Sequence, residues 1–191
     1  MPNTVNATAI ANDALRYNGA GYQFGGSPAT GIGHWDCSSF VSWVMGHDLK
    51  MSVPMYPNGT YTGNAHGATA AQYIVWTGAT SIPRSSAAPG DLCCWLTHIG
   101  IVVGDNQMIS AYDTAQGTLV TAIDSAGPAG EPLTIRRVNN AVGQISGATT
   151  TGASGCSIPS AMVVMGFALQ HRIQRRRYIP RSKYSYRSSS R

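Results

Sequence analysis

The sequence predicts an α+β domain in which N-terminal helices pack against an antiparallel sheet, followed by a basic C-terminal extension. Two helical patterns lie in the first fifty residues, and several short β-branched runs separated by turns follow from residue 89 onward. The chain has 191 residues, of which 43% are hydrophobic and 11% are charged. This composition supports a buried core and excludes a coiled coil or a disordered acidic chain.

Two helices are expected near the N-terminus. Residues 4–17 have one apolar side and stop at an Asn-Gly pair. A second helix begins at Cys37, after a glycine-broken loop at 25–33, and its apolar residues recur at three- and four-residue spacing. Gly46 stands where a C-cap glycine is expected. We expect the first helix to pack behind the second.

The middle of the chain predicts loops and then a sheet. Residues 50–70 are rich in Pro, Gly, Asn and Thr, which indicates the irregular wall of a cleft rather than a core element. His66 in this segment is interpreted as a solvated loop histidine. Residues 70–76 predict a short helix or strand, and 77–88 a loop. Strands are then expected at 92–96, 98–103, 108–112, 117–123 and 133–138, with a hairpin turn at Asp105-Asn106.

The composition changes after residue 138. We expect one domain over 1–138, a Gly/Ser/Thr-rich linker over 139–159, and a short helix with a basic Arg/Tyr/Ser tail over 160–191. Residues 1–170 hold 5 basic and 8 acidic side chains, a balance of −3, whereas 171–191 hold 8 basic and no acidic ones, a balance of +8. Such a tail could bind nucleic acid through phosphate contacts and stacking, or be a solvated extension only.

The sequence shows no pattern typical of a targeting segment or of a metal site. The N-terminus lacks the basic and apolar regions of a signal peptide, so none is expected. The longest apolar run, 161–169, is about half the length that spans a bilayer, so no transmembrane segment is expected. Cys93 and Cys94 are neighbours in a strand-like run and point to opposite faces. We therefore expect reduced cysteines, no metal ion and no organic cofactor.

Cys37 and His98 are the candidate nucleophile and base. Cys37 lies at a helix start, where unpaired N–H groups and the helix dipole favour thiolate over thiol. The alternative for Cys37 is a small buried apolar side chain. His98 precedes a β-branched run, and histidine has a pKa suited to taking the thiol proton and returning it to a leaving amine.

Four motifs occur in a defined order: Tyr22-x-Phe24-Gly25-Gly26, Asp36-Cys37-Ser38-Ser39-Phe40-Val41, Pro89-Gly90-Asp91-Leu92 and His98-Ile99-Gly100-Ile101-Val102-Val103-Gly104. Together they resemble the NlpC family of papain-like cell-wall cysteine peptidases, over roughly residues 4–138.

The resemblance implies a papain-like fold and a reaction. Members of the family cleave stem-peptide amide bonds of peptidoglycan, typically between D-glutamate and a diamino acid, which implies that Cys37 is the nucleophile and His98 the base. It also suggests that Tyr22, Asp36 and Ser38 line the site that holds the free amino end of the stem peptide. Asp36 has an equally good use as a helix N-cap.

The third catalytic residue departs from the family pattern, which often has histidine there. The usual spacing places Ser110 at this position, and Asp113 lies three residues on. With a two-residue hairpin loop, His98 would lie opposite Asp113 and Ser110 would face away; with a three-residue loop, Ser110 would share the face of His98. A serine cannot stabilise an imidazolium as a carboxylate does, so Asp113 would be the better orienting residue.

The absence of a visible export signal suggests a bacteriophage enzyme that reaches the cell wall in the virion. We expect a tail-tip peptidoglycan hydrolase whose residues 160–191 bind neighbouring tail proteins, with anionic wall polymer as another partner for the basic tail. Three alternatives stay open: a non-enzymatic phage tail structural or assembly protein that retains the fold, a lysin, and a CHAP-type amidase.

Overall fold

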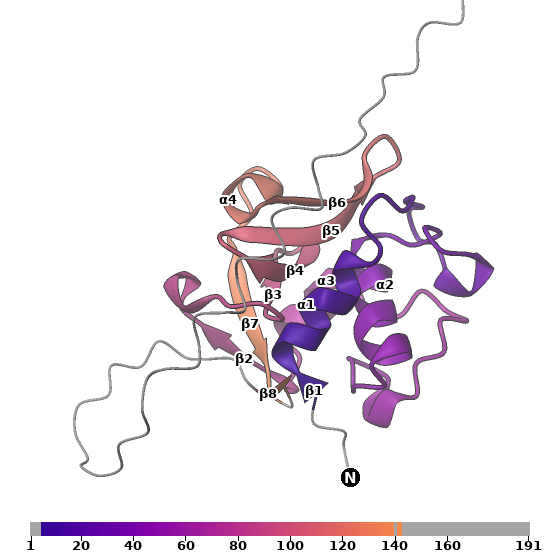
Figure 1. Cartoon of the computed structure of the whole chain (residues 1–191), viewed down its shortest axis with the longest axis horizontal. Helices are drawn as coiled ribbons and strands as arrows, with labels where there is room; N and C mark the ends of the chain where they lie inside the picture. Colours follow the sequence, from indigo (N-terminus) through magenta and orange to yellow (C-terminus); the bar gives the residue numbers. More distant parts are fainter. Residues whose placement is uncertain (1–4, 140, 143–191) are drawn as a thin grey trace, which may run out of the picture. The chain divides into compact units, whose positions relative to one another are not determined.

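The computed structural model describes residues 5–139 and 141–142 and contains a six-stranded antiparallel sheet with helices packed against it (Figure 1). The strand order is β2-β7-β3-β4-β5-β6. Its strands are β2 (Ala79–Ile82), β3 (Leu92–Cys94), β4 (Ile99–Gly104), β5 (Gln107–Asp113), β6 (Gly117–Ala122) and β7 (Thr134–Val138). The predicted α+β class is therefore confirmed.

The helices are short. They are α1 (Ala7–Leu15), α2 (Cys37–Ser42), α3 (Ala70–Ile74) and α4 (Ile123–Ala126), with a π-helical segment η2 (Trp43–Asp48) continuing α2. Single 3₁₀ turns are η1 (Pro28–Thr30), η3 (Pro57–Gly59) and η4 (Arg84–Ser86). A separate parallel pair joins β1 (Val5–Asn6) to β8 (Ala141–Val142). Residue 139 and β8 fall within the predicted linker; its other residues, 140 and 143–159, and residues 160–191 lie outside the described residues.

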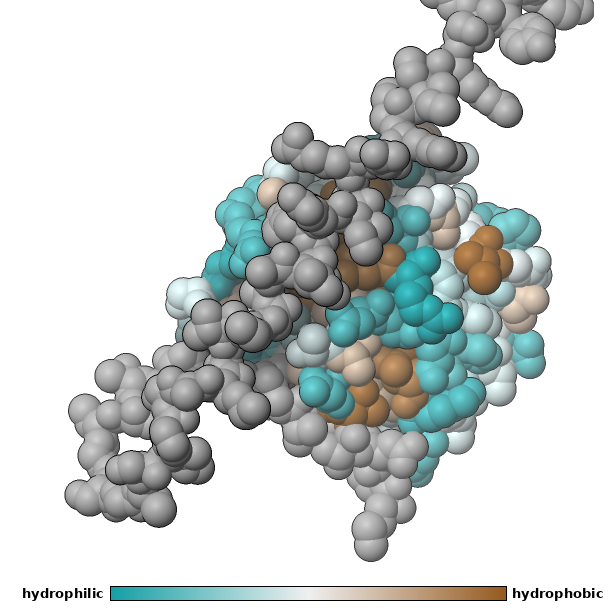
Figure 2. Space-filling view, viewed as in Figure 1, coloured by the Kyte–Doolittle hydropathy of each residue, from teal (hydrophilic) through white to brown (hydrophobic). Residues whose placement is uncertain are grey.

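The sheet has a core on each face. On one face, side chains of β4 and β5 such as Ile99, Ile101 and Ile109 pack with α1 and α2. On the other face, side chains such as Val102 and Met108 pack with α4. Strand alternation separates the two sets, because successive side chains point to opposite faces. The exposed surface in Figure 2 shows apolar residues in small separated groups among hydrophilic ones.

The first helix packs behind the second, as the sequence predicts. Asn6 caps α1 by accepting a hydrogen bond from the N–H of Thr8. The hydroxyl of Tyr17 donates to Asp48 and accepts from the indole N–H of Trp43, which fixes the end of α1 against η2. The predicted span of 4–17 is longer than the observed α1, since residues 5–6 form β1 instead.

The second helix does not end at Gly46, so the predicted C-cap is wrong. The backbone continues through Gly46 as the π-helical segment, which ends at Asp48 with Leu49 as its C-cap. A Cβ at position 46 would lie 2.8 Å from the Cβ of Tyr61, which leaves room for glycine only. The glycine is therefore explained by close packing rather than by helix termination.

The Pro-Gly-Asp turn before β3 contacts both α1 and β7. Gly90 has a φ of +90°, and a Cβ there would lie 2.2 Å from the carbonyl oxygen of Ala7. The fully buried carboxylate of Asp91 accepts hydrogen bonds from the guanidinium of Arg137 on β7, at 2.8 and 3.0 Å. A buried carboxylate needs such partners, so this pair fixes β3 beside β7.

The remaining predictions are confirmed only in part. The predicted strands and the turn at Asp105-Asn106 are confirmed, and the segment 70–76, predicted as a short helix or strand, contains α3. The segment 77–88, predicted as a loop, contains β2, and α4 begins at the last residue of the strand predicted over 117–123. The interpretation of 50–70 as a wall outside the core is only partly right, because Met51, Val53 and Tyr61 are buried. Within the described residues, no helix is long and apolar enough to cross a membrane.

Candidate functional site

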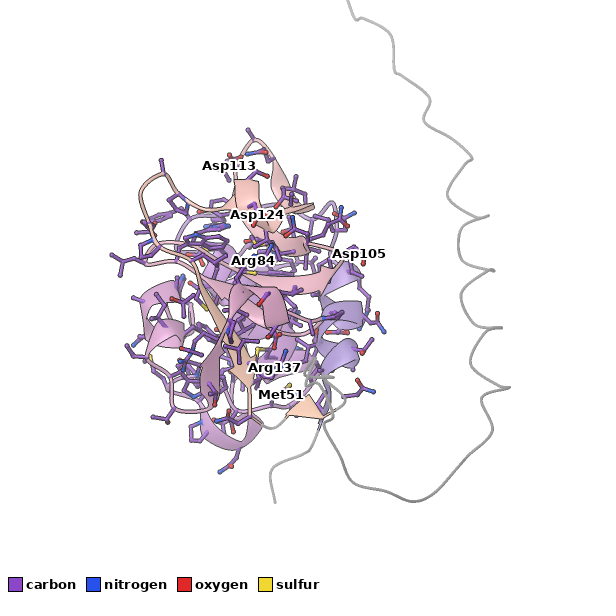
Figure 3. The ribbon with its side chains drawn as sticks, turned by 90° about the vertical axis from the view of Figure 1, so that its left-hand side faces the viewer. Met51, Arg84, Asp105, Asp113, Asp124 and Arg137 are labelled. Carbon is purple, nitrogen blue, oxygen red and sulfur yellow. The ribbon has the colours of Figure 1, made fainter. Side chains whose placement is uncertain are left out.

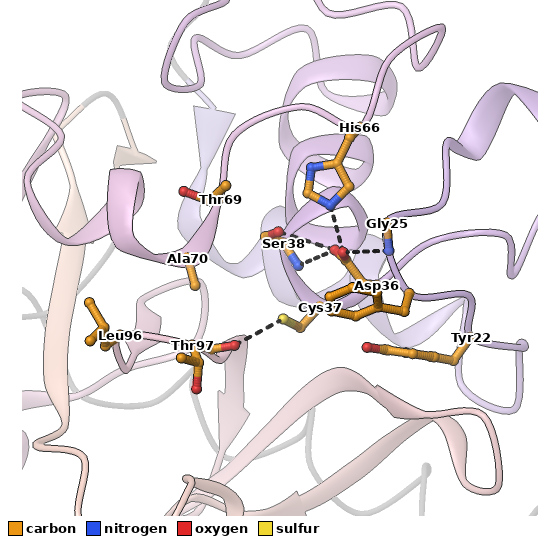
Figure 4. A pocket seen from close by; sticks show the side chains of 11 residues that line it. Tyr22, Gly25, Asp36, Cys37, Ser38, His66, Thr69, Ala70, Leu96 and Thr97 are labelled. Atoms are coloured by element: carbon orange, nitrogen blue, oxygen red, sulfur yellow. Dashed lines mark hydrogen bonds and ion pairs between the residues drawn. The ribbon is translucent and has the colours of Figure 1, made fainter.

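A pocket of about 400 Å³ opens at the first turn of α2 (Figure 4). Its lining comes from the loop before α2, the start of α2, the 50–70 segment, α3 and the turn between β3 and β4. These residues are Tyr22, Phe24, Gly25, Asp36, Cys37, Ser38, His66, Thr69, Ala70, Leu96 and Thr97. All three predicted substrate-binding residues and the predicted nucleophile therefore line one pocket.

Asp36 is the N-cap of α2. Its Oδ1 accepts hydrogen bonds from the backbone N–H and the hydroxyl of both Ser38 and Ser39, and the Ser39 hydroxyl accepts from the Asp36 N–H in return. This capping box satisfies the first-turn donors of the helix. The N-cap use that the sequence left open is thus present in the structure.

The other oxygen of Asp36 faces the pocket. Oδ2 accepts from the N–H of Gly25 at 3.2 Å and from Nε2 of His66 at 2.5 Å. Burial raises the pKa of Asp36, but the hydrogen bonds from His66 and the backbone outweigh burial and lower it to about 2. Asp36 therefore carries a full negative charge at neutral pH.

His66 is not the solvated histidine that the sequence predicts. Its side chain is 29% exposed and pairs with Asp36, and Figure 4 shows the ring directly over that carboxylate. The hydrogen bond to Asp36 raises the pKa of His66, and burial opposes the shift. No local pattern marks this role, because the 60–67 loop must first fold over the start of α2.

Cys37 is buried at the edge of the pocket. The residue is 8% exposed, and Sγ lies 3.9 Å from the carbonyl oxygen of Thr97. Burial, followed by the charge of Asp36, raises the pKa of Cys37 to about 12, although the N–H groups of Ile99 and Ser38 oppose this. Burial thus opposes the helix-start effect from which the sequence predicts a thiolate.

His98 follows Thr97 in the chain, and its ring is buried. The ring packs against Trp95 and Tyr112, with centroids 5.9 and 4.9 Å away, and Nε2 is buried without a hydrogen-bond partner. Burial lowers the pKa of His98 to about 4. Among the described residues no hydrogen bond joins its ring to Cys37, whose Sγ contacts the carbonyl oxygen of Thr97 instead.

The β4–β5 hairpin decides which residue faces His98. Its turn has two residues, Asp105-Asn106, both with positive φ. A bulge between Val102 and Gly104 then shifts the pairing by one residue, so that Ile101 pairs with Ile109. Beyond the bulge, the register is that of a three-residue loop.

Ser110 therefore shares the face of His98, and Tyr112 takes the position opposite the histidine. The Ser110 hydroxyl is fully buried and donates to the carbonyl oxygen of Ile99 at 2.6 Å. Since the hydroxyl is committed to the backbone, Ser110 does not hold the imidazole in this structure.

Asp113 lies at the far end of β5, where the chain turns into β6 (Figure 3). Its carboxylate accepts hydrogen bonds from the backbone N–H groups of Ala115 and Gln116 and from the Gln116 side chain, at 2.7 to 2.8 Å. The bulged register removes it from the position opposite His98. The structure thus does not bring Asp113 to the imidazole.

Glu131 is a carboxylate near His98 that the sequence does not single out. It accepts hydrogen bonds from the backbone N–H and the hydroxyl of Thr97, at 2.9 and 2.5 Å. Its charge raises the pKa of His98, against the larger effect of burial. Glu131 therefore fixes the turn whose carbonyl touches Cys37 and supplies negative charge beside the histidine.

The described residues contain no candidate metal site, and their cysteines are free. Residues 5–139 and 141–142 hold no group of three His, Cys, Asp or Glu side chains that could bind a metal ion. Cys37, Cys93 and Cys94 are free and buried, and Cys93 and Cys94 pack in the cores on opposite faces of the sheet.

Helices packed on an antiparallel sheet, with a cysteine at a helix start facing a pocket, define a papain-like α+β domain. The chain belongs to the NlpC/P60 family, whose model matches residues 19–137. A solved structure, NlpC1 from Trichomonas vaginalis, aligns with a TM-score of 0.50 and 21% identity over 72% of this chain and 46% of that one.

Curated relatives are longer proteins. The chain is 32% identical over 110 residues to the probable endopeptidase p60 of Listeria innocua, covering 55% of this chain and 20% of that protein. It is 30% identical over 114 residues to the bifunctional muramidase/DL-endopeptidase CwlT of Bacillus subtilis, covering 55% and 29%. The chain thus spans about a fifth to a third of the length of these relatives.

Proposed function

We propose that this chain hydrolyses stem-peptide amide bonds of peptidoglycan by acyl transfer through Cys37. The observation that carries the proposal is the position of Cys37, whose side chain borders the pocket at the first turn of α2, beside the turn that bears His98. The family and the two relatives named as endopeptidases support the reaction class.

The chemistry starts from a neutral pair. The Cys37 thiol adds to the amide carbon while His98 takes its proton; the imidazolium then protonates the amine as the C–N bond breaks, and water hydrolyses the thioester. Asp36 holds the N–H groups of Ser38 and Ser39, which leaves the Cys37 N–H at the helix start to stabilise the oxyanion. This step needs a hydrogen bond between His98 and the sulfur, and catalytic hydrogen bonds often tighten only when substrate binds.

The substrate bond that we propose lies between D-glutamate and a diamino acid. Asp36 carries the negative charge of the pocket, and Tyr22 and Ser38 line the wall beside it, so the three suit the amino end of a short peptide. A pocket of this size and mixed lining is typical of sites that hold small ligands.

We further propose a location in a phage tail tip, with residues 160–191 binding neighbouring tail proteins. The supporting feature is the charge of +8 over 171–191. Proteomic analysis of purified phage particles tests the location. Recovery of the chain only from lysed cells would favour a lysin or a host enzyme, and retention of the isolated tail on DNA would favour nucleic acid as its partner.

Mass spectrometry of muropeptides tests the activity. Purified peptidoglycan is digested with the wild-type chain and with Cys37→Ala, whose folding is checked by circular dichroism. We expect fragments cut after D-glutamate from the wild type and none from the variant. Fragments cut at the junction of glycan and stem would show an amidase, and no cleavage by the folded wild type would show a non-enzymatic protein that retains the fold.

A further inference from the structure

His66 lines the pocket, and the proposed mechanism gives it no role. It lies in the loop between η3 and α3, and its Nε2 reaches Asp36 Oδ2 at 2.5 Å. Asp36 is the residue beside the nucleophile, so the histidine closes one side of the pocket over the carboxylate (Figure 4). This contact therefore affects whatever cationic group the pocket takes.

The two oxygens of Asp36 have different partners. Oδ1 is fully used by the backbone and hydroxyl donors of Ser38 and Ser39, which belong to the fold of α2. Oδ2 is held by the N–H of Gly25 and by His66, which is a partly exposed loop side chain. His66 is thus the partner of Asp36 that can move away without undoing the helix cap.

We propose that His66 competes with the cationic amino end of a bound peptide for Asp36 Oδ2, so that the pocket accepts an ammonium group when His66 is neutral and rejects it when His66 is protonated. The inference rests on the proposed function in one respect, since it takes a peptide with a free amino terminus as the ligand.

His66 is the pocket residue whose protonation sets the net charge beside Asp36. Asp36 stays ionised, because its pKa is lowered to about 2, and the pair with it raises the pKa of His66. Two other titratable groups line the pocket, Cys37 and Tyr22, and burial raises the pKa of both. His98 and Tyr61 also feel the charge of Asp36; burial lowers the pKa of His98 to about 4 and raises the pKa of Tyr61, so all four shifts favour the neutral form. The net charge of the pocket lining is therefore −1 when His66 is neutral and 0 when His66 is protonated.

The sign of the effect follows from this charge. At acid pH the imidazolium neutralises Asp36 and an incoming ammonium must displace it. At higher pH a neutral imidazole leaves the charge of Asp36 for the ligand, until the amino group itself loses its proton at about pH 8. Because one proton leaves for one ammonium bound, the dissociation constant falls by up to about tenfold per pH unit on the acid side of the His66 pKa.

Binding by isothermal titration calorimetry tests the inference without turnover. Full-length Cys37→Ala protein is titrated, from about pH 5.5 to about pH 7.5, with a synthetic peptide that contains a D-glutamyl–diamino acid bond and a free amino terminus, and with its N-acetylated form. We expect the dissociation constant of the free-amine peptide to fall as pH rises, that of the acetylated peptide to stay within about twofold, and the pH dependence to vanish in a His66→Gln variant.

The matched control is His47→Gln. His47 also pairs with an aspartate, Asp48, at 2.8 Å, but it lies in η2 outside the pocket. This variant should keep the wild-type pH dependence. The inference is overturned if both peptides respond alike to pH, if His66→Gln retains the dependence, or if neither peptide binds. Muropeptide digestion tests the proposed function separately. An active enzyme whose peptide binding does not depend on pH would refute only the role of His66.

Discussion

Cys37 should react slowly with alkylating reagents in the resting protein. Burial and the charge of Asp36 raise its pKa from 9.0 to about 12. A rise of three units lowers the thiolate fraction at neutral pH by ~10³-fold, and the thiolate is the reactive species. We therefore expect alkylation by iodoacetamide ~10³-fold slower than in the urea-unfolded chain, with a rate that rises through pH ~10 without a plateau.

The assay is timed alkylation followed by mass spectrometry of the peptide that contains Cys37. Cys93 is the internal control, because it is fully buried with a pKa also raised to about 12, and its alkylation reports unfolding of the whole domain. A rate at Cys37 that reaches a plateau below pH ~8 would mean a thiolate–imidazolium pair at rest, and would refute the argument from burial.

Three further substitutions test the site and its support. Asp36→Ala removes the capping box of α2, and urea titration should find the free energy of unfolding lower by about 1–2 kcal/mol; an unchanged midpoint would contradict the capping role. Gly46→Ala places a methyl group 2.8 Å from Tyr61 and should destabilise by about 1–3 kcal/mol in the same assay, whereas wild-type stability would mean that Tyr61 can retreat. Glu131→Gln removes a charge that raises the pKa of His98 against the larger effect of burial; NMR titration should find this pKa lower than in the wild type, and an equal value would leave Glu131 a structural role only.

Local patterns explain why most of the fold could be predicted. The spacing of apolar residues after Cys37 identifies α2, and the Asp105-Asn106 pair identifies the hairpin turn, since both depend on neighbours in sequence. The sequence does not predict β2, because its four residues have no alternation and are held by pairing with β7, more than fifty residues later. The close packing of Gly46 against Tyr61 is a tertiary contact, so no local pattern distinguishes it from a helix C-cap.

The sequence predicts part of the candidate site, because four of the predicted residues line the pocket whereas His98, Ser110 and Asp113 do not. The pocket does gather Tyr22, Asp36, Cys37 and Ser38. The helix-start argument fixes the sign of one effect on Cys37, but burial acts in the opposite direction and only the folded chain shows which is larger. The role of His66 depends in the same way on a loop fold that no local pattern encodes.

The central claim is that Cys37 forms the covalent intermediate, and trapping that intermediate tests it most directly. The wild-type chain is mixed with stem peptide, quenched in acid and analysed by mass spectrometry after proteolysis. We predict an acyl group on the peptide that contains Cys37, absent when the substrate is omitted. Cleavage of the stem peptide with the acyl group on another residue, or undiminished cleavage by Cys37→Ala, would contradict the account.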